Sequence, residues 1–144
     1  PNNKARIEAV KRHDVHHIVT GYKADWRGEI EIAGWELSSG CGKYFMAWYF
    51  NTGSFFIGLF LFPKALYHAF IEGKSCRNNF YDSIEYDQEI LNKILGEIRT
   101  QMFFEKTEGK TLLNNLSFVG YFLLSLLHPL FYILLICAIQ RIFF

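Results

Sequence analysis

The chain has 144 residues, which is enough for one domain with a buried core and too short to suggest two. Apolar residues make up 51% of the chain and aromatic residues 18%, more aromatic surface than a small soluble core needs. The net charge is +1, with basic residues scattered among acidic ones, which argues against nucleic acid as a partner. Cys41, Cys76 and Cys137 are isolated and form neither a disulfide framework nor a zinc motif. Because of the high apolar and aromatic content, we expect part of the surface to face lipid or a lipid-like ligand.

The N-terminal part predicts two helices. Residues 3–20 carry apolar residues and histidines at helical spacing, and Gly21 is a natural stop. After a short connection, residues 29–37 form a second amphipathic segment. The serines and glycines of residues 38–42 then break the chain.

The next segment, residues 44–62, is uncharged and just long enough to cross a bilayer. Its centre, residues 51–54, is polar, which is unfavourable in a helix that faces lipid. We therefore favour a buried or half-inserted helix that lines a hydrophobic cavity over a membrane span. Pro63 is suited to open another short helix, over residues 64–72.

The C-terminal part predicts an amphipathic helix over residues 86–104, a charged linker over 105–110 and a membrane anchor. Residues 116–139 are uncharged and long enough to cross the hydrocarbon core. Pro129, which follows His128, is expected to kink this helix, or the stretch folds back as a re-entrant pair of helices. Two lysines, Lys106 and Lys110, precede the span and one basic residue, Arg141, follows it. This places the body on the cytoplasmic side of a bacterial inner membrane or the matrix side of a mitochondrial inner membrane.

The predicted fold is therefore all-α: a helical bundle with a hydrophobic lipid-binding cavity and a C-terminal transmembrane helix. Residues 1–105 form the metal- and lipid-binding domain, and residues 106–144 form the linker and the membrane anchor. Other membrane proteins of a complex are further expected partners, because aromatic-rich surfaces often meet other subunits.

The residues that indicate chemistry are His13, Asp14, His17 and Glu29. On a helix the first three share one face, while His16 points further round. Two imidazoles one turn apart, with a carboxylate beside them, can bind one divalent cation, and Glu29 can fold back from the next helix as an oxygen ligand. Such a mixed set suits Zn, Fe, Mn, Co or Mg. The same spacing also arises by chance on ordinary surface helices. Spacing alone does not distinguish a metal site from such a chance arrangement.

Two other metal motifs fit these residues less well. The HExxH motif of zinc proteases needs glutamate as general base, and here Asp14 stands in its place. His13, His16 and His17 satisfy the HxxHH pattern of membrane di-iron hydroxylases. Such enzymes use many histidines, whereas this chain has five in all. That alternative requires His16 to be as important as His13.

The motif resembles that of a known family. His-Asp-x-x-His, eleven residues and then Glu is met by His13, Asp14, His17 and Glu29, with Thr20-Gly21 and Gly28 flanking it. This spacing is similar to the metal motif of the coenzyme Q biosynthesis protein 4 family, and residues 90–101 resemble the closing segment of that family more loosely. The resemblance covers residues 1 to about 105.

The resemblance implies an all-helical body with a tunnel for a polyprenyl tail and a metal site at its mouth. The metal would face the aromatic head group of a ubiquinone precursor, and the family is linked to oxidative removal of the carboxyl from that ring. The apolar C-terminal segment departs from the family, whose members are peripheral. The alternative function is an accessory subunit of a membrane complex built on the same helical body.

Overall fold

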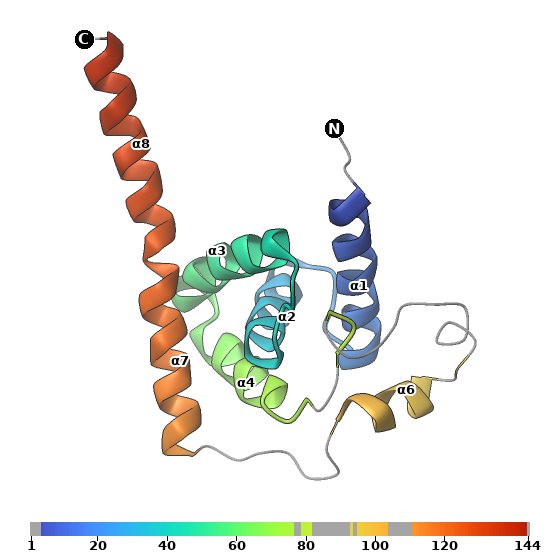
Figure 1. Ribbon diagram of the computed structural model, residues 1–144. Helices are drawn as coiled ribbons and strands as arrows, with labels where there is room; N and C mark the ends of the chain where they lie inside the picture. The colour runs from blue at the N-terminus through green and yellow to red at the C-terminus, as the bar shows by residue number, and fades with distance from the viewer. Residues whose placement is uncertain (1–3, 77–78, 82–92, 94, 104–110, 144) are drawn as a thin grey trace.

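The computed structural model describes residues 4–76, 79–81, 93, 95–103 and 111–143 (Figure 1). Across these residues the chain forms helices and no strand, with one isolated bridge between Cys76 and Phe103. The all-α prediction is confirmed. The helices are α1 (Lys4–Thr20), α2 (Trp26–Ser39), α3 (Phe45–Leu61), α4 (Pro63–Gly73), α6 (Leu95–Met102), α7 (Leu112–Ser125) and α8 (Leu127–Phe143).

Residues at the ends of the two N-terminal helices determine where these helices stop and start. Helix α1 ends where predicted, because Gly21 adopts a left-handed backbone with φ of 82°. Helix α2 begins at Trp26, ahead of the predicted start at residue 29. The cause is Asp25, whose side chain accepts a 2.8 Å hydrogen bond from the Gly28 N–H and so caps the helix.

Helix α2 is the centre of the body, packed between α3 and α4. Its Leu37 is buried in one core cluster with Phe55 of α3 and Phe70 of α4. Its Trp35 is buried in a second cluster with Ala69 of α4. Helices α2 and α4 can approach closely because Gly34 has no side chain, and a Cβ there would lie 2.9 Å from a carbonyl oxygen of α4. Close packing against α3 on one side and α4 on the other therefore fixes the position of α2.

Helix α3 keeps its polar centre inside the protein. Asn51 is buried against Glu36 of α2 and Thr52 against His128 of α8, whereas Phe50 and Phe60 are exposed. This arrangement agrees with the predicted helix that is packed against the body, and it explains the polar residues that count against a span. The predicted Pro63 start of the following helix is confirmed.

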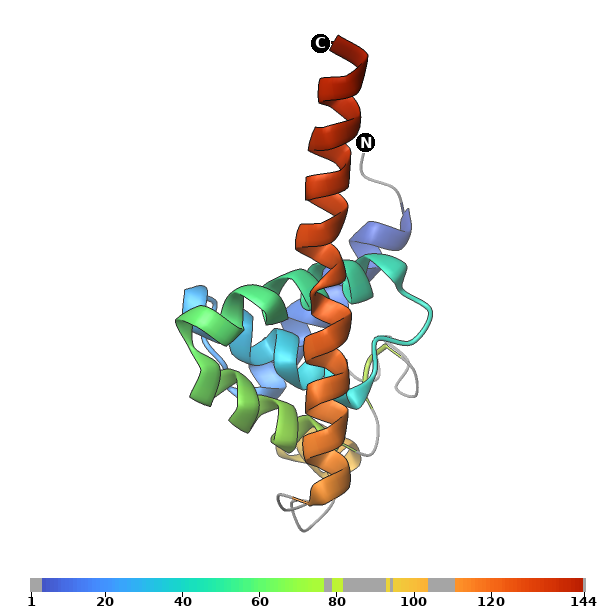
Figure 2. The same cartoon turned by 90° about the vertical axis from the view of Figure 1, so that its left-hand side faces the viewer.

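The C-terminal part is a long apolar rod (Figures 1 and 2). Residues Leu112–Arg141 form a helix of 30 residues, long and apolar enough to cross a membrane, and 6% of its most apolar window is buried. The helix is interrupted at Leu126, because Pro129 has no N–H for the carbonyl of Ser125. Helix α8 continues in nearly the same direction as α7, so the re-entrant pair does not form.

The body contacts this rod at its first half. Helix α7 packs against α3 and α4, and α3 also meets the beginning of α8, after which α8 extends away from the body (Figure 2). Most of the predicted helix over residues 86–104 lies outside the described residues, which show its end as α6. The predicted linker over 105–110 lies outside them as well.

Candidate metal centre

Three side chains from two helices meet at one point. His13 and His17 lie on successive turns of α1, and Glu29 lies in the first turn of α2. The two Nε2 atoms are 3.2 Å apart. Glu29 Oε2 is 3.3 Å from His13 Nε2, and Glu29 Oε1 is 3.4 Å from His17 Nε2. Of the predicted set, these three residues converge from adjacent helices.

These separations fit ligands of a single metal ion. Nitrogen and oxygen ligands held 2.0–2.1 Å from a tetrahedral zinc ion lie about 3.3 Å from one another. In octahedral sites, neighbouring ligands at about 2.1 Å are roughly 3.0 Å apart. Three protein ligands leave at least one coordination position open in either geometry, which is typical of catalytic centres rather than structural ones.

The other ring nitrogens of the two histidines fix which atoms face this point. His17 Nδ1 lies 3.0 Å from the carbonyl oxygen of Tyr22, which can only accept a hydrogen bond. His13 Nδ1 lies 3.1 Å from Glu36 Oε1, another acceptor. Both Nδ1 atoms therefore donate, and in the neutral rings both Nε2 lone pairs face each other at 3.2 Å. Two lone pairs and a carboxylate at that distance repel unless a cation or a proton lies between them.

Glu36 supports the centre from inside the protein. It lies on α2 with 0% of its side chain exposed, and Oε1 accepts hydrogen bonds from His13 Nδ1 and His16 Nδ1. Its Oε2 accepts from Asn51 Nδ2 at 2.6 Å and from the Tyr81 hydroxyl at 3.2 Å. A buried carboxylate with four donors is well satisfied, and it holds the His13 ring in one orientation.

His16 belongs to this support and not to the ligand group. It is fully buried, and Nδ1 donates to Glu36 at 2.7 Å while Nε2 accepts the Phe80 N–H at 3.2 Å. Neither ring nitrogen is left to bind a metal. This geometry argues against the HxxHH alternative, which needs His16 as a ligand. The sequence interpretation set His16 aside because it points away from His13 and His17, but its burial and bonds give it a structural role.

The charges of the site follow from these contacts. Burial opposes protonation of His13, but the hydrogen bonds and negative charges of Glu36 and Glu29 outweigh it and raise the His13 pKa to about 9. Burial would raise the pKa of Glu36, but the histidine hydrogen bonds lower it instead. Burial lowers the pKa of His16. In the metal-free protein, His13 therefore holds a proton where a metal ion would otherwise sit.

The structure places Asp14 elsewhere. Asp14 is exposed on α1, and it is not part of the group formed by His13, His17 and Glu29. An adjacent position on a helix differs by about 100° in direction, which turns the Asp14 side chain away from the point where the two imidazoles meet. Its predicted role as a ligand therefore stays a prediction that this geometry does not support.

Two pockets open beside the candidate centre. One, of about 190 Å³, is lined by His13, Glu29 and Glu36 together with apolar side chains such as Met46 and Phe50. The other, of about 430 Å³, is lined by Trp26, Ile57 and, again, Glu29. Both pockets meet Glu29, so the open side of the centre faces partly apolar space. The smaller pocket lies between α1, α2 and α3, and the larger lies between α2 and α3.

Comparison with known proteins adds no relative. No protein-family model matches this chain, and no curated protein or solved structure matches it either. The resemblance to the coenzyme Q biosynthesis protein 4 family thus depends on the motif and its spacing in the sequence.

Proposed function

We propose that this chain is a membrane-anchored protein that binds one divalent metal ion and holds the acidic aromatic head group of a polyprenyl lipid beside it. His13, His17 and Glu29 would be the metal ligands. The observation that carries the proposal is the convergence of their three ligand atoms while both Nδ1 atoms are already engaged. A bound ion would supply electrostatic attraction for a carboxylate or phenolate oxygen of the head group.

The types of ligand atom also limit which metal ions the centre would bind. Two imidazole nitrogens and a carboxylate are ligands for Zn, Fe, Mn or Co, and for Mg less readily, because Mg prefers oxygen. Thiolate-seeking metals are disfavoured, since the Cys41 thiol is buried and burial raises its pKa strongly. The protein would hold the ion through neutral Nε2 atoms, with Glu29 lowering the positive charge.

A lipid as the second ligand is supported by the surroundings of the centre. The pocket beside His13 and Glu29 is lined by Met46 and Phe50. Phe50 is exposed, so the apolar lining of the pocket extends to the outer surface of α3. The apolar rod α7–α8 would keep the body at a membrane surface. A polar head at the centre and an apolar tail along α3 would then match both parts of the pocket.

The motif resemblance extends the proposal to isoprenoid quinone biosynthesis, with a ubiquinone precursor as the lipid. The body would lie on the cytoplasmic side of a bacterial inner membrane or the matrix side of a mitochondrial inner membrane. An accessory role in a membrane complex is the second candidate. It is favoured by the exposed side chains along α8, such as Phe131 and Ile136, to which another subunit could bind.

The proposal is tested by measuring the metal and the lipid retained by the full chain after extraction in a mild detergent. We expect about one divalent ion per chain in the wild type, and close to none in His17→Ala. Asp14→Asn is the matched control on the same helix, and it should keep the metal because Asp14 lies outside the ligand group. A prenylated phenol or quinone should co-purify with the wild type.

Two results would count against the proposal. The first is a wild-type protein without metal, or a His17→Ala variant with as much metal as the wild type. The second is steady co-purification with larger membrane proteins, with that association unaffected by His17→Ala and no prenyl lipid retained. The second result would favour the accessory role.

A further inference from the structure

One side of α3 is an apolar surface that the described part of the body leaves exposed. Phe55 of α3 is buried in the core of the body. Residues two or five positions from Phe55 point to the opposite side of the helix. They are Phe50, Gly53, Ile57 and Phe60, and we call them the outer face of α3. Phe50 and Ile57 are exposed, Phe60 is 72% exposed, and no charged residue occurs within α3.

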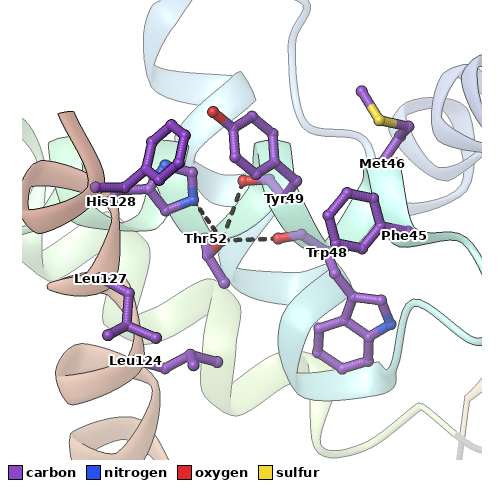
Figure 3. Close-up of a pocket in the computed structure, with 9 residues that line it drawn as sticks. Phe45, Met46, Trp48, Tyr49, Thr52, Leu124, Leu127 and His128 are labelled. Carbon is purple, nitrogen blue, oxygen red and sulfur yellow. Dashed lines mark hydrogen bonds between the residues drawn. The ribbon is translucent and has the colours of Figure 1, made fainter. Parts of the chain in front are cut away.

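The C-terminal rod crosses α3 from its buried side to its outer face. Phe118 of α7 packs against Phe55, with 5.1 Å between the ring centroids. Further along the rod, His128 Nε2 of α8 lies 2.8 Å from the Thr52 hydroxyl of α3 (Figure 3). The same imidazole ring lies against Gly53 of the outer face. Helix α8 therefore leaves the body on the side of the outer face, and it extends beyond α3 in both views of the ribbon (Figures 1 and 2).

Polar and charged groups of the body indicate which half of the rod lies in hydrocarbon. Helix α4 packs beside α7, and the Tyr67 hydroxyl of α4 donates a 2.6 Å hydrogen bond to Asn115 of α7. A membrane that covered α7 would also take in α4, with Glu72 and Lys74 at its end, and burying such charges in lipid is costly. Helix α8 has no charged residue before Arg141, and its residues 130–141 are exposed. The part of the rod that lies in the membrane is therefore α8.

The part of the rod beyond α3 is too short to cross a bilayer by itself. His128 marks the level of α3, and Arg141 ends the apolar stretch. Between these two residues the helix rises about 20 Å, at about 1.5 Å per residue. The hydrocarbon core of a bilayer is about 30 Å thick, so about 10 Å of it has to lie at the level of α3. A helix with its side chains is about 10 Å across, so a complete crossing places α3 at the boundary between acyl chains and head groups.

The residues around α3 suit that depth. Lys43 precedes the helix and Lys64 follows it, and both are exposed. In helices that lie in a membrane interface, lysines reach the lipid phosphates while aromatic and aliphatic side chains enter the acyl region. Trp26, at the start of α2, is 77% exposed and lines a pocket together with Ile57 of the outer face. Tryptophan is enriched at this boundary.

We propose that α3 lies flat in the membrane interface, with its outer face among the acyl chains of the leaflet nearest the body and with Lys43 and Lys64 at the phosphates. Two helices, α3 and α8, then hold the body to the bilayer, which fixes its orientation as well as its distance. The pocket beside His13 and Glu29, which Phe50 of the outer face lines, opens at the membrane surface. The inference rests on the membrane anchoring in the proposed function but not on the metal centre.

The test uses the full chain in nanodiscs of phosphatidylcholine and phosphatidylglycerol, with one nitroxide spin label at a time. Cys76→Ser and Cys137→Ser remove two thiols, and Cys41 is kept because it is buried and out of reach of the label. Labels at Ile57→Cys and Phe60→Cys report on the outer face. Oxygen concentrates among acyl chains and a charge-neutral nickel chelate stays in water, so the ratio of their collision rates with a label measures its depth.

Two further labels are matched controls. Ile18→Cys replaces an exposed isoleucine near the end of α1 that points away from the membrane side, and Leu135→Cys replaces an exposed leucine of α8 (Figure 1). We expect the oxygen-to-nickel ratio at Ile57 and Phe60 to be several-fold above that at Ile18 and close to that at Leu135. His17→Ala removes a candidate metal ligand and should leave these ratios unchanged, so failure of either proposal is visible on its own. Circular dichroism of each variant checks that the helices are intact.

Three outcomes would overturn the inference. Nickel collisions as frequent at Ile57 as at Ile18 would show that the outer face meets water. A label at Ile57 shielded from both oxygen and nickel would show that protein covers this face, and spin–spin broadening would identify that protein as a second copy of the chain. A label at Leu135 that meets nickel as freely as the one at Ile18 would remove the membrane anchoring, and with it both this inference and the proposed function.

Discussion

Replacing Glu36 by glutamine is expected to lower the free energy of unfolding by about 3–5 kcal/mol, although the two side chains have the same shape. Each carboxylate oxygen of Glu36 accepts two hydrogen bonds in the buried interior. A glutamine amide nitrogen in either place would point its hydrogens at two donors. The loss is large because the unsatisfied groups are cut off from water.

The same variant should weaken metal binding about 10- to 100-fold, the usual effect of removing a carboxylate that orients a ligand histidine. His13 depends on Glu36 for the hydrogen bond at Nδ1, whereas His17 uses the Tyr22 carbonyl. Chemical denaturation in detergent and calorimetric titration with a divalent metal would measure the two effects.

The matched control is Glu31→Gln, on the same helix. Glu31 pairs with Arg27 at 3.1 Å, and the Arg27 side chain is 63% exposed. A pair of this kind contributes about 0.3–0.5 kcal/mol. If Glu36→Gln were no more damaging than Glu31→Gln, the buried support of the centre would not be as described.

The stability of the metal-free protein is expected to fall between pH 6.5 and 9, and metal binding is expected to remove most of this fall. In the metal-free protein, Glu36 and Glu29 raise the His13 pKa to about 9 against the effect of burial. A protonated His13 therefore stabilises the folded state fully below about pH 6.5, the ordinary histidine value, and this contribution is lost as pH rises toward 9. Metal-free protein should become less stable over that interval.

Metal binding removes the same proton. Between pH 6.5 and 9 the metal competes with a proton for His13 Nε2, so its affinity should rise by up to about tenfold per pH unit. Melting temperatures at pH 6, 7.5 and 9, with a chelator or with saturating metal, should show a gap that widens with pH. In His13→Gln the gap should be small at every pH. A gap in the wild type that stays constant or narrows would contradict the assignment of the proton to His13.

The local parts of this structure could be predicted from the sequence. The spacing of His13 and His17 places them on one face of any helix, and Gly21 and Pro63 mark helix ends through their own backbone preferences. The uncharged C-terminal stretch predicts a long apolar helix in the same way. Such features depend on neighbours within a few residues.

The buried Glu36 and the hydrogen bonds that it accepts, which support the candidate metal centre, were harder to predict from the sequence. Glu36 follows Glu29 by two helical turns and so lies on the same face of α2, a signal that was present in the sequence. Its apolar neighbours gave no indication that a buried carboxylate would be satisfied there. The donors from Asn51 and Tyr81 depend on how distant segments pack, and no spacing rule reports that.

Asp14 shows the opposite limitation. Its place in the motif suggested a ligand, because a helix face of about 100° includes it with His13 and His17. The contacts of α1 with α2 decide which part of that face turns inward, and the point where the imidazoles meet excludes Asp14. Sequence spacing gives directions around one helix, but the neighbouring helix selects among them.

X-ray absorption spectroscopy of the metal-loaded full chain tests the central claim most directly. We expect two imidazole ligands with metal–nitrogen distances of about 2.0–2.1 Å, oxygen in the remaining positions and no sulfur. When His17→Ala is loaded with excess metal, one imidazole contribution should be missing from its spectrum. A spectrum with sulfur ligands, or one unchanged by His17→Ala, would contradict a centre built from His13, His17 and Glu29.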